Sequence, residues 1–69
     1  MADLHRKVLG ENVRKFRQRL NWSQEKLAER ADMHWTFISG VERGKYNISL
    51  DSLARIAKAL RRQPYELLR

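Results

Sequence analysis

The chain has 69 residues, so we expect one domain over residues 1–69 with a small core. It contains no cysteine, which excludes disulfides and thiolate metal sites. Fifteen Lys and Arg residues against eight Asp and Glu residues give a formal net charge of +7, and such a chain is expected to bind a polyanion, most commonly nucleic acid.

The first helix is predicted from near Leu4 to Leu20. Its apolar residues recur at steps of four, three and four, which places them on one face of a helix; they are Leu9, Val13, Phe16 and Leu20. Asn21 suits the left-handed position that commonly closes a helix.

Two short helices are predicted next. Ser23 opens the first, because its hydroxyl can accept a hydrogen bond from an amide of the first turn, and Asp32 and Met33 end it. The second runs from Trp35 to Arg43, and Gly44 follows it. The residues expected in the core are Leu27, Ala28 and Ala31 from the first of these helices, and Phe37, Ile38 and Val41 from the second.

A fourth helix is predicted after the cap residue Ser49, and a short fifth helix begins at Gln63 or Pro64. The expected core side of the fourth helix is Leu50, Leu53, Ile56, Ala57 and Leu60. These elements predict an all-α fold, a compact bundle of five helices. Because a three-residue break joins the second and third helices, they are expected to cross steeply, as in a helix-turn-helix.

The outer face of the third predicted helix carries mainly small and hydrogen-bonding groups, where an ordinary surface helix would carry long charged side chains. It carries Trp35, Thr36, Ser39, Gly40 and Arg43. Such a surface suits a helix that enters the major groove of DNA, where Thr36 and Ser39 would bond to base edges. Trp35 would lie on a thymine methyl or on the backbone, or would instead pack on a neighbouring residue, and Gly40 would allow close approach.

Several short motifs, in register, resemble the phage-repressor-like (Xre/Cro-type) helix-turn-helix DNA-binding family. They are Ser23-Gln24, Leu27-Ala28, Ile38-Ser39, Val41-Glu42-Arg43-Gly44, Ser49-Leu50 and Leu53. The stretch HWTFISGVERGKYNISL is particularly similar to controller proteins of restriction-modification systems, although phage and plasmid repressors share most of these residues. The resemblance implies a lambda-repressor-like fold and a transcriptional regulator that binds a palindromic operator in double-stranded DNA as a homodimer.

The residue pattern and the resemblance together predict the site. The base-reading residues are Trp35, Thr36, Ser39 and Gly40, with His34 beside them; the phosphate contacts are Gln24, Arg43, Lys45, Asn47, Arg14 and Ser23. A structural ion pair is expected between Arg17 and Glu42, and a dimer interface at Tyr65, Leu67 and Leu68. His34 stands where the family has a Ser or Thr cap, so this cap is expected to be weaker or made differently. Because the family often has polar side chains at Trp35 and Gly40, we expect limited direct readout and a contribution from DNA shape.

The sequence supports other functions less well than DNA binding. An enzyme is not expected, because no nucleophile motif, phosphate loop or metal-ligand spacing occurs, and no cofactor, metal or small-molecule ligand is evident. The main alternative is a protein-interaction adaptor or an antitoxin-type module on the same fold; a basic RNA-binding peptide is a further one. With no long apolar run and no signal peptide, no membrane contact is expected, and a cytoplasmic location is predicted.

Overall fold

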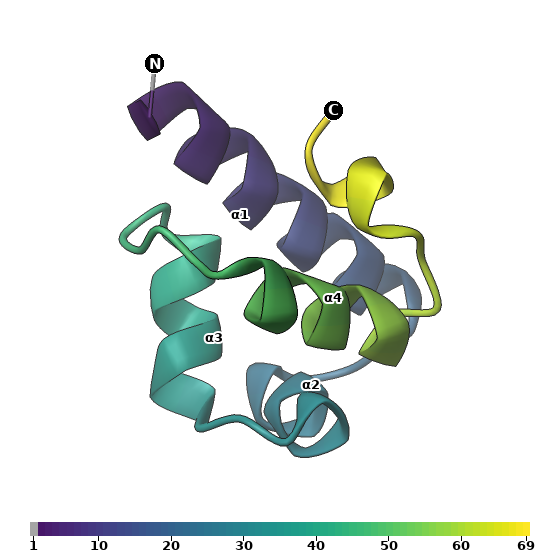
Figure 1. The fold of residues 1–69 in the computed structure, drawn as a ribbon. Coiled ribbons are helices and arrows are strands. Elements are labelled where there is room, and N and C mark those ends of the chain that lie inside the picture. Colours follow the sequence, from purple (N-terminus) through teal and green to yellow (C-terminus); the bar gives the residue numbers. More distant parts are fainter. Residues whose placement is uncertain (1) are drawn as a thin grey trace.

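Four α-helices and one turn of 3₁₀-helix make up residues 2–69, the part of the chain that the computed structural model describes (Figure 1). The elements are α1 (Ala2–Arg19), α2 (Gln24–Ala31), α3 (Trp35–Glu42), α4 (Leu50–Ala59) and η1 (Pro64–Leu67). The described residues form an all-helical bundle, as predicted. The prediction of a fifth α-helix was wrong for the last segment. Its four residues form a 3₁₀ turn, in which the Glu66 amide donates to the Gln63 carbonyl at 2.9 Å. No described helix is long and apolar enough to span a membrane.

The ends of the helices follow from local side-chain chemistry. Ser23 Oγ accepts from the Lys26 amide at 3.0 Å and so caps α2, as predicted. Ser49 caps α4 in the same way, accepting from the Ser52 amide at 3.0 Å. Asn21 has φ 59°, which confirms the predicted left-handed residue after α1.

The imidazole of His34 caps α3. Its Nδ1 accepts from the Thr36 amide at 3.2 Å, so a ring nitrogen does the work that a Ser or Thr hydroxyl commonly does at this position. The cap of α3 is therefore made differently from the usual Ser or Thr cap, which is one of the two outcomes expected for His34.

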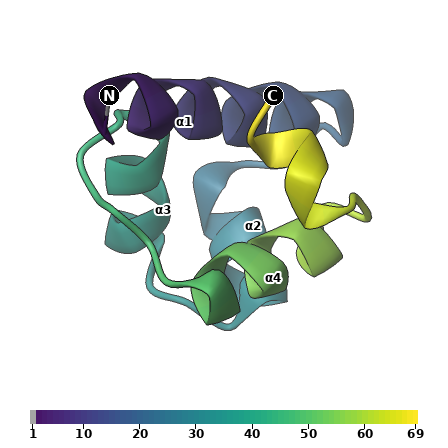
Figure 2. The ribbon, with the colours of Figure 1, turned by 45° about the horizontal axis from the view of Figure 1, so that its top comes forward.

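The helices enclose one core. Figure 2 shows α1 and α4 on opposite sides of the molecule, with α2 and α3 between them and η1 joining the end of α4 back to α1. The buried apolar residues come from every element: Leu9, Val13, Phe16, Leu27, Ala28, Ala31, Ile38, Val41, Leu53, Ile56, Ala57, Leu60 and Leu67. This set confirms the predicted helical faces with few exceptions.

Leu50 is the main exception, because its side chain is 82% exposed instead of buried. It is the first residue of α4. Helical side chains point back toward the N-terminus of their helix, so this one projects past the end of α4 and beyond the core. The prediction of Leu50 as a core residue was wrong for this reason.

Two further contacts hold α1 in place, and the spacing of apolar residues does not predict either of them. Gly10 lies against the backbone of α3: a Cβ atom there would come within 2.5 Å of the Val41 carbonyl oxygen. The buried Asn12 donates through Nδ2 to the carbonyls of Leu67 and Arg69, each at 3.0 Å. These contacts set the position of α1 relative to α3 and to the C-terminal segment.

Candidate nucleic-acid interface

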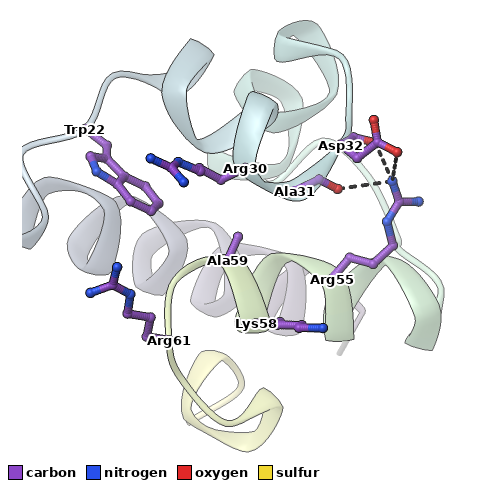
Figure 3. A pocket seen from close by; sticks show the side chains of 8 residues that line it. All are labelled: Trp22, Arg30, Ala31, Asp32, Arg55, Lys58, Ala59 and Arg61. Carbon is purple, nitrogen blue, oxygen red and sulfur yellow. Dashed lines mark hydrogen bonds and ion pairs between the residues drawn. The ribbon is translucent and has the colours of Figure 1, made fainter.

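The turn between α2 and α3 is stabilised by the backbone conformation of Asp32 and by hydrogen bonds from α4. Asp32 takes the left-handed conformation (φ 56°), which Asp tolerates better than most residues. The guanidinium of Arg55 in α4 donates to the carbonyl of Ala31 at 3.0 Å and to that of Asp32 (Figure 3). These are the carbonyls that the end of a helix leaves without an intrahelical partner. Sequence reasoning missed Arg55, since nothing in the pattern shows which helix lies next to the turn.

Glu42, at the end of α3, is the centre of a polar network. Its side chain is fully buried, and its Oε2 lies 2.6 Å from Nε of Arg17, which is 12% exposed. A second nitrogen of Arg17 donates to Glu42 Oε1 at 3.0 Å, and Gln24 Nε2 donates to the same oxygen at 3.1 Å. Arg14 Nε lies 3.5 Å from it, and Arg17 also donates to the Trp22 carbonyl at 2.7 Å. The network therefore joins α1, the start of α2 and the end of α3.

Protonation of Glu42 is coupled to this network. Burial raises the pKa of Glu42. Hydrogen bonds from Arg17, Gln24 and Arg14, together with the attraction of the Arg17 charge, lower it by more than burial raises it, so the net pKa lies below its ordinary value. The hydrogen bond to Glu42 raises the pKa of Arg17 against the opposite effect of its burial. Both groups therefore stay charged near neutral pH.

The outer face of α3 carries three exposed or half-exposed side chains able to meet a ligand. Trp35 is 47% exposed and stacks on His34, with ring centroids 6.3 Å apart; Thr36 is exposed and Ser39 is half-buried. Thr36 Oγ1 lies 2.7 Å from His34 Nδ1. In the arrangement in which that nitrogen accepts from the Thr36 amide, the Thr36 hydroxyl meets it as a donor. The oxygen of the exposed Thr36 then keeps its capacity to accept a hydrogen bond.

Gly40 is not part of this face. It is buried, and a Cβ atom there would lie 2.1 Å from Cε2 of Tyr46. The Tyr46 ring stacks on Phe37, with centroids 5.4 Å apart and an interplanar angle of 10°. The small residue makes room for the protein's own tyrosine, so the assignment of Gly40 to close approach by DNA was wrong. Tyr46 lies six residues along the chain, beyond what a helical wheel of α3 can include.

The residues predicted to meet phosphate fall into two groups. Arg43, Lys45, Asn47 and Ser23 are exposed, the first three along the segment that follows α3. Arg43 also donates from Nε to the Ser39 carbonyl at 3.4 Å. Gln24 and Arg14 instead turn toward Glu42 and belong to the network described above, while the Arg14 side chain remains 51% exposed.

The three residues predicted at a dimer interface also divide. Tyr65 is 60% exposed and Leu68 is 51% exposed. Leu67 has no exposed surface and lies in the monomer core, so its placement at an interface was wrong. The alternation arises because a 3₁₀ turn of four residues presents one side to α1 and α4 and the other outward.

Comparison with known proteins agrees with this geometry. The chain matches the HTH_3 helix-turn-helix family over residues 13–67. It is 50% identical over 69 residues to control protein C.BamHI of Bacillus amyloliquefaciens, covering 99% of this chain and 85% of that protein. It is 44% identical over 63 residues to control protein C.SmaI of Serratia marcescens, covering 91% of this chain and 75% of that protein.

Solved structures give the same result. The crystal structure of the restriction-modification controller protein C.AhdI from Aeromonas hydrophila matches with a TM-score of 0.87 at 35% identity, covering 90% of this chain and 94% of that one. The similarity thus extends over nearly the whole chain in sequence and in fold. The chain belongs to the HTH_3 helix-turn-helix family, whose members are DNA-binding transcriptional regulators and not enzymes, and its relatives include restriction-modification controller proteins.

Proposed function

We propose that the chain acts as a controller of a restriction-modification system, inserting α3 into the major groove of a palindromic operator as one half of a homodimer. The observation that carries the DNA-binding role is the exposed face of α3, which has short polar side chains and no acidic residue, on a helix held at its far end by a buried ion pair. The similarity to control proteins C.BamHI and C.SmaI supports the controller role. A rigid support is what a base-reading helix needs, because a hydrogen bond to a base tolerates little displacement.

Thr36, Ser39 and Trp35 are the proposed contacts to base edges. The Thr36 hydroxyl already donates to His34, so Thr36 would accept a hydrogen bond from an amino group, N6 of adenine or N4 of cytosine. Ser39 can donate or accept, and the exposed indole of Trp35 suits the methyl group of thymine.

Backbone contacts would come from the segment after α3 and from helix N-termini. Arg43, Lys45 and Asn47 are exposed in the segment that follows α3. The first amides of α2 and α4 lie behind the caps Ser23 and Ser49, and such helix starts attract phosphate through free N–H groups and the helix dipole. These contacts fix register and affinity without reading sequence.

Two substitutions test the division between base and backbone contacts. Thr36→Ala should lower discrimination at one base pair of each half-site by about 1–3 kcal/mol, because an acceptor is lost. Lys45→Ala should weaken matched and scrambled duplexes alike and reduce the slope of log affinity against log salt by about one. Fluorescence anisotropy across a salt series, on an operator selected from a random duplex library, measures both.

The selected sites also test the architecture. Inverted half-sites about 34 Å apart along the duplex are expected for a two-fold dimer. Identical losses for Thr36→Ala and Lys45→Ala on every duplex would contradict base reading by α3. No affinity for any duplex at modest ionic strength would instead favour the adaptor role.

The homodimer is proposed to form through exposed apolar residues near η1 and the start of α4. Leu50 and Leu68 line the same groove, of about 200 Å³, and are 82% and 51% exposed; Tyr65, on η1, is also exposed but does not line this groove. Apolar side chains this open on a small domain are typical of a surface that a partner covers.

Sedimentation velocity tests this interface. The unchanged chain should sediment as a dimer, whereas Leu50→Glu and Leu68→Glu should each give monomers with an unaltered helical circular dichroism spectrum, because two like charges would meet across the two-fold axis. Gln18→Glu, on an exposed position of α1, adds the same charge elsewhere and should leave the dimer intact. Dimers that persist in both leucine variants would show that the interface lies on another face.

A further inference from the structure

A basic pocket lies between α2 and α4, away from the exposed face of α3. Its volume is about 350 Å³, and no residue of α3 lines it. Of its eight lining residues one, Asp32, is acidic and four are cationic: Arg30, Arg55, Lys58 and Arg61. Figure 3 shows the Trp22 indole at one end of the pocket, with Arg30 and Arg61 near it and Arg55 at the other end.

One of the four cations is already engaged. Arg55 bonds to the carbonyls at the end of α2 and lies 3.8 Å from the Asp32 carboxylate. Arg30, Lys58 and Arg61 form no ion pair with any acidic side chain of residues 5–69. Arg30 and Arg61 lie at the Trp22 end of the pocket, whereas the Lys58 side chain runs along α4 toward the Arg55 side (Figure 3). Like charges at the edge of one hollow give it a positive potential, which an anion would relieve.

The remaining wall of the pocket suits a flat, partly apolar group. Trp22 is half-buried, and the guanidinium carbon of Arg30 lies 5.8 Å from its ring centroid. Ala31 and Ala59 add small apolar surfaces. Aromatic rings and arginine planes are the side chains on which nucleobases stack.

The conformation of Arg61 is also unusual. Its φ is 60°, in the left-handed region that glycine adopts more readily than any residue with a side chain. A cation therefore occupies the rim of the pocket at a position where glycine would be favoured conformationally.

We propose that this pocket binds a nucleoside phosphate at its Trp22 end, with the phosphate held by Arg30 and Arg61, the base against Trp22, and Lys58 adding positive potential from α4. A volume of about 350 Å³ falls within the usual range for small-molecule sites, about 300–1,000 Å³. A concave site of this size admits one nucleotide, whereas a duplex presents a broad convex surface that stays outside it. The proposal does not depend on the operator or on dimerisation.

Nuclear magnetic resonance of the full chain tests the proposal directly, because the protein carries two tryptophans in the two places to be compared. Trp22 lies in the pocket, and Trp35 lies on α3. Titration with AMP at constant ionic strength should shift the Trp22 indole N–H resonance saturably at millimolar concentration or below and leave that of Trp35 in place. Inorganic phosphate should bind the same site more weakly, and adenosine should leave the spectrum unchanged.

Each other result would overturn the proposal. A shift confined to Trp35 would place the ligand on α3, and no saturable shift with AMP or phosphate would mean that the pocket takes neither. Equal affinity for AMP and inorganic phosphate would disprove the contact between the base and Trp22.

A pair of matched variants separates local binding from overall charge. Lys58→Gln combined with Arg61→Gly removes two pocket cations, and glycine accepts the left-handed conformation, so the fold should persist. This variant should bind AMP about tenfold more weakly. Lys15→Gln combined with Arg69→Gln removes two exposed charges outside the pocket and should change affinity by less than about twofold. Similar losses in both variants would reveal a general charge effect and contradict a built site.

Discussion

Replacing Glu42 by alanine should lower the free energy of unfolding by about 3–5 kcal/mol, because it leaves the nearly buried Arg17 without its anionic partner. A core of this size rarely supplies more than about 3–5 kcal/mol in total, so much of the variant should be unfolded at 37 °C. Urea unfolding followed by circular dichroism measures the change.

Two controls show whether the cost comes from an unpaired buried charge. Arg17→Ala should be similarly damaging, since Glu42 would then be the charge left in the interior. Combining Arg17→Met with Glu42→Leu should recover much of the lost stability, because an apolar pair of similar volume leaves no charge unpaired. A loss below about 1 kcal/mol for Glu42→Ala would show that the pair is solvated in solution.

Acid should act on the same residue in a predictable direction. The folded state lowers the pKa of Glu42, so its contribution to the free energy of unfolding is complete above its ordinary value of 4.5 and is lost as the pH falls toward the lower folded value. Glu66, whose pKa is lowered by the Gln63 amide, adds to the same trend. Glu42→Gln should therefore reduce, without abolishing, the fall in stability between pH 5 and pH 3 that urea titrations detect.

Gly10→Ala should lower the free energy of unfolding by about 2–3 kcal/mol, even though alanine is the better helix former by about 1 kcal/mol. The added methyl group would lie 2.5 Å from the Val41 carbonyl oxygen and 2.7 Å from that of Glu42. Both atoms belong to the backbone of α3, so relief requires α1 and α3 to move apart. Thermal unfolding and operator binding should both report the change, because the displaced helix is the one proposed to read bases.

Gly40→Ala is the matched control for this prediction. Its added methyl group meets the ring of Tyr46, a side chain that is 38% exposed and has room to swing outward. The loss of stability should therefore be smaller than for Gly10→Ala. In a protein that already carries Tyr46→Ala, adding Gly40→Ala should cause no further loss. A milder effect at Gly10 than at Gly40 would contradict the close approach of α1 to α3.

Much of the fold follows from interactions between residues close in sequence. The spacing of apolar residues marks the buried faces of α1 to α4, because a helix repeats every 3.6 residues whatever surrounds it. Ser23 and Ser49 begin helices by bonding to amides three residues ahead, and Asn21 enters the left-handed region because its short polar side chain allows it. Such features are predictable since both partners lie within one turn.

Other features depend on which elements lie side by side, and the local sequence pattern does not predict which elements pack together. Gly10 and Gly40 look alike in the sequence, yet one meets the backbone of a different helix and the other meets an aromatic ring from a loop. Leu50 lies on the apolar side of its helix but projects beyond the core, whereas Leu67 is covered completely.

The basic pocket shows the same dependence most clearly. Trp22 and Arg61 are 39 positions apart, and each on its own is an unremarkable residue at a helix boundary. Packing of α2 against α4 brings them to one hollow, because burying two apolar helix faces together also sets the positions of the polar residues at their margins. Tertiary structure thus determined which cations share a surface, since a charge interacts with its neighbours in space and not with its neighbours in the chain.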